Sequence, residues 1–143
     1  MSKVIKKVPK RGEIKSIPHR GEIWLVDYNY KPKKNKEKEL EIASRIKKIR
    51  PSLIVSNNEQ NEFDEEIIVA PLSTKDLTMI EPYEIFIRPN KENGLDEDSK
   101  ILFNRLRNIE KDTRLGECRI GVVSKEIMKE AKEKLKLVLD LED

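Results

Sequence analysis

The sequence predicts a mainly β fold with a C-terminal helix, in which a small curled antiparallel sheet forms a partly open barrel. Short runs rich in Ile, Leu and Val recur between turn-forming residues, which is typical of buried strands. One amphipathic stretch with helical spacing follows near the end of the chain. Charged residues make up 40% of the 143 residues and aromatic residues only 5%. The core is therefore expected to consist mainly of aliphatic side chains in a single domain.

Six strands and one long helix are predicted along the chain. The strands span residues 22–28, 50–57, 67–74, 83–87, 99–103 and 117–123. Residues 58–61 are expected to form a turn or a single helical turn, and Trp24 is expected in the core. Ser124 is expected to cap a helix that ends near Leu139. The helix has one apolar stripe that should pack on the sheet, formed by Ile127, Met128, Ala131, Leu135, Val138 and Leu139.

Positive charge is concentrated in two segments. Residues 1–20 contain seven basic residues and one acidic residue, and residues 31–50 contain nine basic and three acidic residues, so each segment has a net charge of +6. The whole chain has a net charge of only +3. Residues 1–19 are interpreted as a basic arm, and residues 20–143 as one domain with a Lys-rich insertion at about 29–49. This asymmetry indicates a polyanionic partner, although solvated basic segments are an equally good interpretation of charge alone.

Several classes of protein are disfavoured. No apolar run approaches the roughly 20 residues of a membrane helix, and the basic N-terminus lacks the apolar region of a secretory signal. Cys118 is the only cysteine, which fits a reducing cytoplasm. No Cys/His cluster indicates zinc, so neither a metal nor another cofactor is expected. His19 is the only histidine, and a general base in the basic arm is the less favoured interpretation of it.

The two central strands indicate a phosphate site. Pro51 favours an extended conformation at Arg50, which places this arginine at the entrance of its strand. Ser73 and Thr74 place hydroxyl groups at the end of the following strand. If the two strands pair in antiparallel fashion, Arg50 and Ser73 meet at one edge of the sheet. A guanidinium beside a hydroxyl is suited to binding a phosphate.

Several short motifs together resemble the MazF/PemK family of toxins. They keep the family's order over residues 20–140 and are Arg20-Gly21-Glu22-Ile23-Trp24, Arg50-Pro51, Val55-Ser56-Asn57, Val69-Ala70-Pro71-Leu72-Ser73-Thr74, Gly94-Leu95, Asp98-Ser99, Arg107-Asn108-Ile109 and Arg119-Ile120-Gly121. The resemblance implies an SH3-like barrel, as in the CcdB, MazF and PemK toxins, usually as a homodimer. It also implies a sequence-selective endoribonuclease that a cognate antitoxin holds inactive.

The resemblance, together with the charge pattern, suggests particular site residues. Arg50 and Ser73 match the family's catalytic positions, where the serine replaces the threonine that is common there. Asn104 falls at a position that is generally acidic in the family. Residues expected to contact single-stranded RNA are Glu22, Lys31, Lys33, Lys34, Thr74, Asn104 and Arg107. Arg107 is expected either to bind a phosphate or to pair with a carboxylate such as Glu110 or Asp112.

The chemistry of RNA cleavage fits these candidates. RNA supplies its own nucleophile, the 2′-hydroxyl, so an enzyme has to align it and stabilise the charge at phosphorus. Two other functions stay open at this point. One is a catalytically impaired RNA- or DNA-binding module of the same fold, and the other, less favoured, is a toxin that poisons gyrase. A rival interpretation of the candidate pair is that Arg50 pairs with Glu22 and that Ser73 caps a turn.

Overall fold

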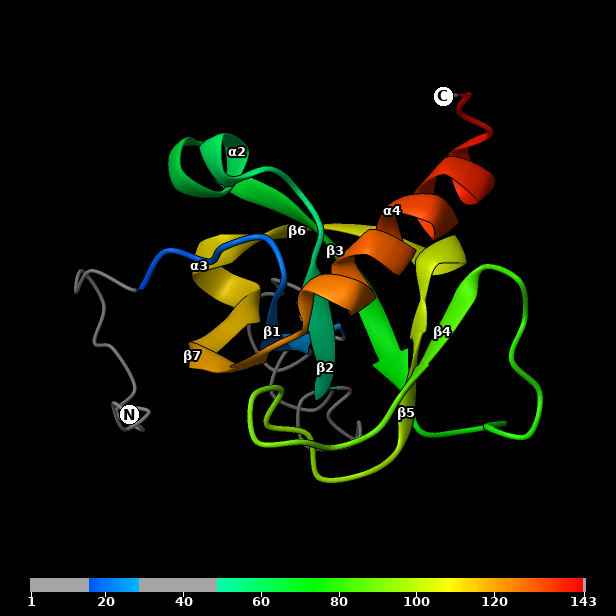
Figure 1. Cartoon of the computed structure of the whole chain (residues 1–143). Coiled ribbons are helices and arrows are strands. Elements are labelled where there is room, and N and C mark those ends of the chain that lie inside the picture. Colours follow the sequence, from blue (N-terminus) through cyan, green and yellow to red (C-terminus); the bar gives the residue numbers. More distant parts are fainter. Residues whose placement is uncertain (1–15, 29–48, 143) are drawn as a thin grey trace, which may run out of the picture.

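The computed structural model describes residues 16–28 and 49–142, which form a curled antiparallel sheet with one long helix across it (Figure 1). Seven strands lie in the described residues. They are β1 (Glu22–Asp27), β2 (Ile49–Ile54), β3 (Glu66–Ser73), β4 (Glu84–Ile87), β5 (Ser99–Leu102), β6 (Arg107–Glu110) and β7 (Leu115–Val122). The helices are α2 (Asn58–Phe63), the 3-10 turn η1 (Phe103–Arg105), α3 (Lys111–Arg114) and α4 (Lys125–Leu139).

Strand β3 organises the sheet, whose order is β4-β5-β3-β2-β1-β7. One edge of β3 pairs with β2, and the other edge pairs with two strands in succession. Its first half pairs with β6 and its last two residues pair with β5. The turn η1 lies between β5 and β6, so the chain bends there and the sheet curls around β3. The predicted curled antiparallel sheet is therefore confirmed, and it is not closed into a complete barrel.

The curled sheet buries an apolar cluster on each of its faces. Adjacent residues along a strand point to opposite faces, so Leu53 and Ile54 belong to different clusters. The cluster that α4 covers includes Ile23, Leu53, Leu72, Ile85, Ile101 and Phe103. The cluster on the other face includes Trp24, Val26, Ile54, Ile67, Val69 and Ile109. The predicted core position of Trp24 is confirmed, because only 1% of this side chain is exposed.

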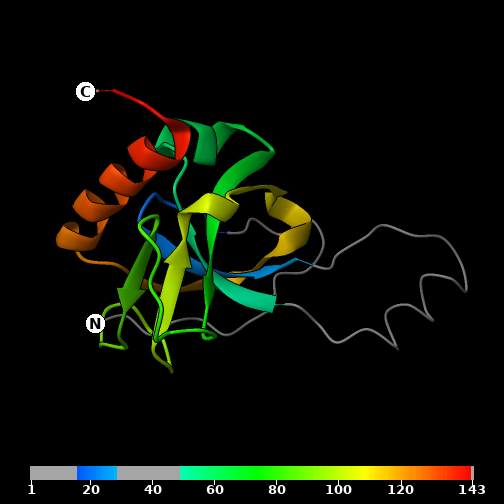
Figure 2. The same cartoon turned by 90° about the vertical axis from the view of Figure 1, so that its right-hand side faces the viewer.

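Helix α4 forms where the sequence predicts it, and it lies along one side of the sheet (Figure 2). The Ser124 hydroxyl accepts a hydrogen bond from the Ile127 amide at 3.1 Å, which caps the first turn. The stripe packs on the sheet as predicted for Ile127, Met128, Ala131, Leu135 and Val138. Leu139 was expected in the same stripe, but 53% of it is exposed because it lies in the last turn, just before the left-handed residue Asp140.

Some local features differ from the prediction. Strand β6 was assigned no structure from its sequence, because only Ile109 of its four residues is buried and no alternating pattern is visible. Residues 58–61 belong to the short helix α2, which is capped by the Asn57 side chain and continues to Phe63. The expected turn or single helical turn is therefore slightly longer than predicted.

A close backbone crossing joins the loop before β5 to β7. A Cβ atom added at Gly121 would lie 2.1 Å from the carbonyl carbon of Asn93, and one added at Gly94 would lie 1.9 Å from the carbonyl oxygen of Ile120. No side chain fits in such a space, so glycine at these positions lets the loop dock directly on the strand. The Val122 amide also donates to the Glu92 carbonyl at 2.8 Å.

Most of the basic arm and of the Lys-rich insertion, residues 1–15 and 29–48, lies outside the described residues. The two domain boundaries proposed from the sequence therefore stay predictions. None of the helices within residues 16–28 and 49–142 is long and apolar enough to cross a membrane.

Candidate functional site

The pairing of β2 with β3 brings Arg50 and Ser73 together. In this antiparallel pair Ser52 lies opposite Pro71 and Leu53 opposite Ala70. Continuing the same register by two residues places Arg50 opposite Ser73, and both line one cavity. Arg50 itself pairs with Val26 of β1, and the printed pairing of β2 with β3 begins two residues later, at Ser52.

The cavity that contains this pair is rich in cationic side chains. Its volume is about 1030 Å³, and its wall comes from β2, from the end of β3 with the following loop, and from the segment between β5 and β6. The cations at its wall are Arg50, Lys75, Lys100, Arg105 and Arg107, and the carboxylates are Asp76, Glu81 and Glu84. A cavity of this size and charge is suited to a phosphate with its attached sugar or base.

The hydroxyl group of Ser73 has a defined partner. The backbone amide of Lys75 donates a hydrogen bond to Ser73 Oγ at 3.1 Å. A serine hydroxyl has one proton to donate in addition to its two acceptor positions. Because the amide occupies an acceptor position, the hydroxyl proton is left for an acceptor such as a phosphate oxygen.

Tyr28 also lines the cavity, a position that was not predicted from the sequence. Its hydroxyl lies 2.5 Å from Ser52 Oγ, and the guanidinium of Arg107 lies over its ring at 5.3 Å from the ring centre. Burial raises the pKa of the Tyr28 phenol to about 12, and this rise outweighs the lowering by the Ser52 hydrogen bond and by the Arg107, Arg50 and Arg114 charges. Tyr28 is therefore protonated at neutral pH and can donate a hydrogen bond but not accept a proton there.

Only some of the residues predicted to contact RNA line the same cavity as Arg50 and Ser73. Asn104 and Arg107 line the cavity with Arg50 and Ser73. The guanidinium of Arg107 contacts the Tyr28 ring rather than Glu110 or Asp112, the two carboxylates proposed from the sequence as its partners. Thr74 is exposed and lines a second cavity, of about 810 Å³, against the outer side of β1, β2 and β7. Lys31, Lys33 and Lys34 lie outside the described residues.

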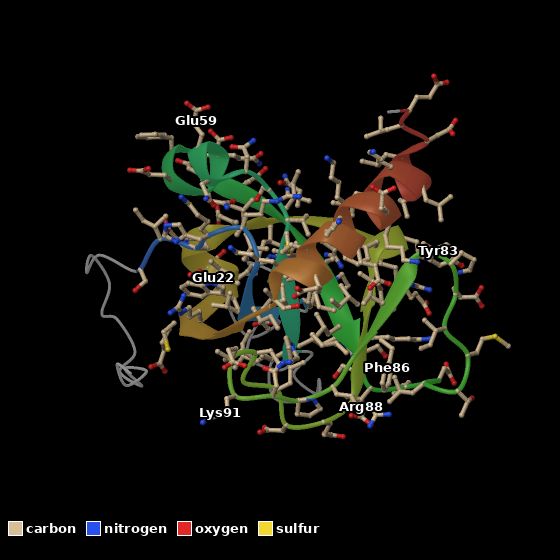
Figure 3. The ribbon with its side chains drawn as sticks, in the orientation of Figure 1. Glu22, Glu59, Tyr83, Phe86, Arg88 and Lys91 are labelled. Carbon is tan, nitrogen blue, oxygen red and sulfur yellow. The ribbon has the colours of Figure 1, made fainter. Side chains whose placement is uncertain are left out.

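Glu22, which is labelled in Figure 3, does not line this cavity and is hydrogen-bonded within the protein. Only 7% of it is exposed. One of its carboxylate oxygens accepts from the His19 amide at 2.8 Å and from the Trp24 indole at 2.9 Å. The other lies 2.9 Å from a guanidinium nitrogen of Arg119 on β7. Glu22 is therefore paired with Arg119 and not with Arg50, the partner that the rival interpretation gave it.

The described residues contain no group of three or more histidine, cysteine or carboxylate side chains placed to hold a metal ion. The chemistry that these residues themselves provide is a guanidinium, a hydroxyl and further cations around one cavity. Such a set can bind a phosphodiester and stabilise additional negative charge on it.

Comparison with solved structures confirms the fold. An endoribonuclease in complex with its cognate antitoxin, from a mycobacterial species, superposes with a TM-score of 0.64 at 21% identity, covering 88% of this chain and 98% of that chain. The Mycobacterium tuberculosis toxin MazF-mt6 gives 0.63 at 19% identity, covering 85% and 99%. MazF from Deinococcus radiodurans gives 0.64 at 16% identity, covering 88% and 99%.

The sequence comparisons assign the family. No curated protein sequence matches the chain. Residues 19–139 match the family described as PemK-like, MazF-like toxins of type II toxin–antitoxin systems. This match covers all strands and helices of the described fold, including both strands that carry the candidate pair. The chain thus belongs to the family of PemK-like, MazF-like toxins of type II toxin–antitoxin systems.

Proposed function

We propose that the chain is an endoribonuclease that cleaves single-stranded RNA at selected sequences without a metal ion and acts as the toxin of a toxin–antitoxin pair. The observation that carries this proposal is that Arg50 and Ser73 both line one cavity rich in cationic side chains. Family membership and the likeness to solved endoribonucleases support it.

The roles of the two residues follow from their chemistry. The 2′-hydroxyl of RNA loses its proton and attacks the adjacent phosphorus, the bond to the 5′-oxygen breaks as that oxygen takes up a proton, and the products carry a 2′,3′-cyclic phosphate and a 5′-hydroxyl. Negative charge builds up on the phosphoryl oxygens in the transition state. Arg50 carries a positive charge and presents paired donors to these oxygens, and Ser73 donates one further hydrogen bond. Arg50 thereby supplies the positive charge that a metal ion supplies in other nucleases.

Single-turnover cleavage tests the proposed site. Purified wild type, Arg50→Ala and Ser73→Ala are incubated with a mixed RNA pool, and the new ends are mapped. Each variant is expected to cleave about 10²-fold or more slowly, because each loses a donor that acts in the transition state. Melting temperatures should change little, since both residues are only half-buried and a substitution at such sites costs about 1 kcal/mol or less.

Control variants and rival outcomes make this test decisive. Thr113→Ala is the matched hydroxyl control, because Thr113 is exposed and lines the other cavity rather than this one. The double variant should lose less than the two single losses combined, since both groups act on one transition state. Wild-type rates in both variants would remove the site. RNA binding without any cleavage by the wild type would instead favour the impaired RNA- or DNA-binding module.

The partners follow from the same cavity. We expect an acidic segment of the antitoxin to cover its cationic rim and to fold as it binds. Co-expression with the neighbouring open reading frame should then relieve toxicity. We also expect a homodimer whose RNA-binding groove spans both subunits, and a monomer by light scattering at micromolar concentration would contradict it. Lysine contacts to phosphate are sequence-blind, so Lys31, Lys33 and Lys34 should add affinity rather than selectivity.

A further inference from the structure

Lys100 is a buried lysine at the edge of the candidate site. It lies on β5 directly opposite Ser73 of β3, and only 7% of it is exposed. A lysine is almost never buried to this degree unless its charge is paired. The neighbouring residues of β5, Ser99 and Ile101, are also buried, so the ammonium needs partners inside the protein.

Three protein acceptors surround the Lys100 ammonium. The carboxylate of Glu84 lies 3.1 Å from Nζ, and the backbone carbonyls of Asp76 and Met79 accept hydrogen bonds at 3.1 Å each. An ammonium group has three N–H donors, so this set accounts for all of them. Lys100 therefore lines the cavity without offering a free donor to a phosphate.

Two of these acceptors belong to the loop of residues 74–83, which forms one rim of the cavity. The ammonium holds the first half of the loop through Asp76, which has a left-handed backbone with φ of 55°. Glu84 holds the second half, because its carboxylate also accepts from the Glu81 amide at 2.9 Å. The Lys100–Glu84 pair thus fastens the loop at both ends.

The same loop orients the proposed catalytic hydroxyl. Lys75, whose amide donates to Ser73 Oγ, immediately precedes the residue whose carbonyl is bound by Lys100. The position of that amide, and with it the direction of the Ser73 hydroxyl, depends on how firmly the loop is held. A shift of about 1 Å in a positioned group can slow a reaction by roughly 10²-fold.

We propose that Lys100, paired with Glu84, is a positioning residue that fixes the loop of residues 74–83 and thereby aims the Ser73 hydroxyl at the scissile phosphate. This inference rests on the proposed function, because it assigns a role in the same reaction. It predicts that the pair affects the rate of cleavage far more than the affinity for RNA.

The test uses two variants that separate positioning from folding. Lys100→Met alone leaves the buried Glu84 carboxylate without its cation, which destabilises a protein strongly. The double variant Lys100→Met/Glu84→Gln removes both charges, keeps similar volumes and retains an acceptor for the Glu81 amide, so it is expected to fold. Lys91→Met is the matched control, because Lys91 is exposed on another loop (Figure 3) and does not line the cavity.

Two measurements are made on each variant. Amide hydrogen exchange is expected to become at least about 10-fold faster in the 74–83 loop of the double variant, but to stay unchanged in β1 and α4. The single-turnover rate at saturating RNA should fall by about 10-fold or more. Binding of a non-cleavable RNA with a 2′-deoxy sugar at the cleavage site should change by less than about threefold, because Lys100 makes no contact with the phosphate.

The possible results are distinguishable. Unchanged loop exchange in the folded double variant would overturn the fastening of the loop. Faster exchange with a wild-type cleavage rate would overturn the positioning role. A wild type that cleaves no RNA would refute the proposed function and the positioning role together. The hydrogen exchange of the loop would still show whether the Lys100–Glu84 pair fastens it.

Discussion

Replacing Tyr28 with phenylalanine should destabilise the protein near neutral pH but stabilise it at strongly alkaline pH. The phenol is buried beside Ser52, and its pKa is raised from 10.0 to about 12. Below pH 10 both the folded and the unfolded chain carry the proton, and the hydrogen bond to Ser52 favours tyrosine by about 1 kcal/mol. Between pH 10 and 12 only the unfolded chain loses the proton, so the free energy of unfolding falls as the pH rises.

The size of this fall follows from the shift. Each pH unit between the two pKa values costs about 1.4 kcal/mol, so the full loss approaches about 3 kcal/mol by pH 12. Near pH 11 the loss should cancel the contribution of the hydrogen bond. The wild type should therefore be more stable than Tyr28→Phe at pH 8, equal to it near pH 11 and less stable above that.

Urea titrations at several pH values measure this crossover. Trp24, the only tryptophan, is buried and reports unfolding by its fluorescence. The difference between wild type and Tyr28→Phe removes the contributions of lysine and other groups that titrate in both proteins. Ser52→Ala is the control, because it removes the hydrogen bond but keeps the phenol and should keep the alkaline loss. A difference that stays constant from pH 8 to pH 11.5 would refute the argument.

Three further results are expected. Gly121→Ala should destabilise the protein by about 2 kcal/mol or more, because its Cβ would overlap the Asn93 backbone. Gly116→Ala meets only ordinary contacts and should cost little. Thermal melting compares the two variants. Glu22→Ala should lower the free energy of unfolding by about 3 kcal/mol, because it leaves buried donors unpaired. The cleavage rate per folded molecule should stay at the wild-type value. A slower rate would restore a role for Glu22 in binding RNA. Cleavage should persist in EDTA, and strict dependence on added magnesium would refute the proposed mechanism.

The parts of the fold that were predictable are those whose signal is local. The β-branched run of β3 and the Ser124 cap of α4 each occupy a short stretch of sequence, and their physical causes act within that stretch. That Arg50 and Ser73 line one cavity was also predictable, because antiparallel pairing of successive strands places the start of one beside the end of the other. The only assumption needed was that β2 and β3 pair in antiparallel fashion.

The parts that were not predictable depend on distant partners. Glu22 resembles a substrate-binding carboxylate in sequence, and its engagement is visible only once β7 brings Arg119, 97 residues away, beside it. Strand β6 lacks an alternating pattern because it is stabilised by pairing with β3 rather than by burial of its own side chains. Lys100 offered one usable signal: a charged residue inside an apolar strand requires a buried partner, although the sequence does not name Glu84.

The cavity contains two kinds of cation, and the difference bears on how the reaction is catalysed. The Lys100 ammonium is surrounded by protein acceptors and pairs with Glu84, so these two charges largely cancel. The guanidinium of Arg107 lies over the Tyr28 ring, 5.3 Å from the ring centre. Tyr28 stays protonated at neutral pH, so it adds a donor and not a base. The cavity wall is therefore organised to stabilise negative charge on a bound group. RNA carries its own nucleophile, so charge stabilisation at the phosphate is the contribution that such a wall can make to its cleavage.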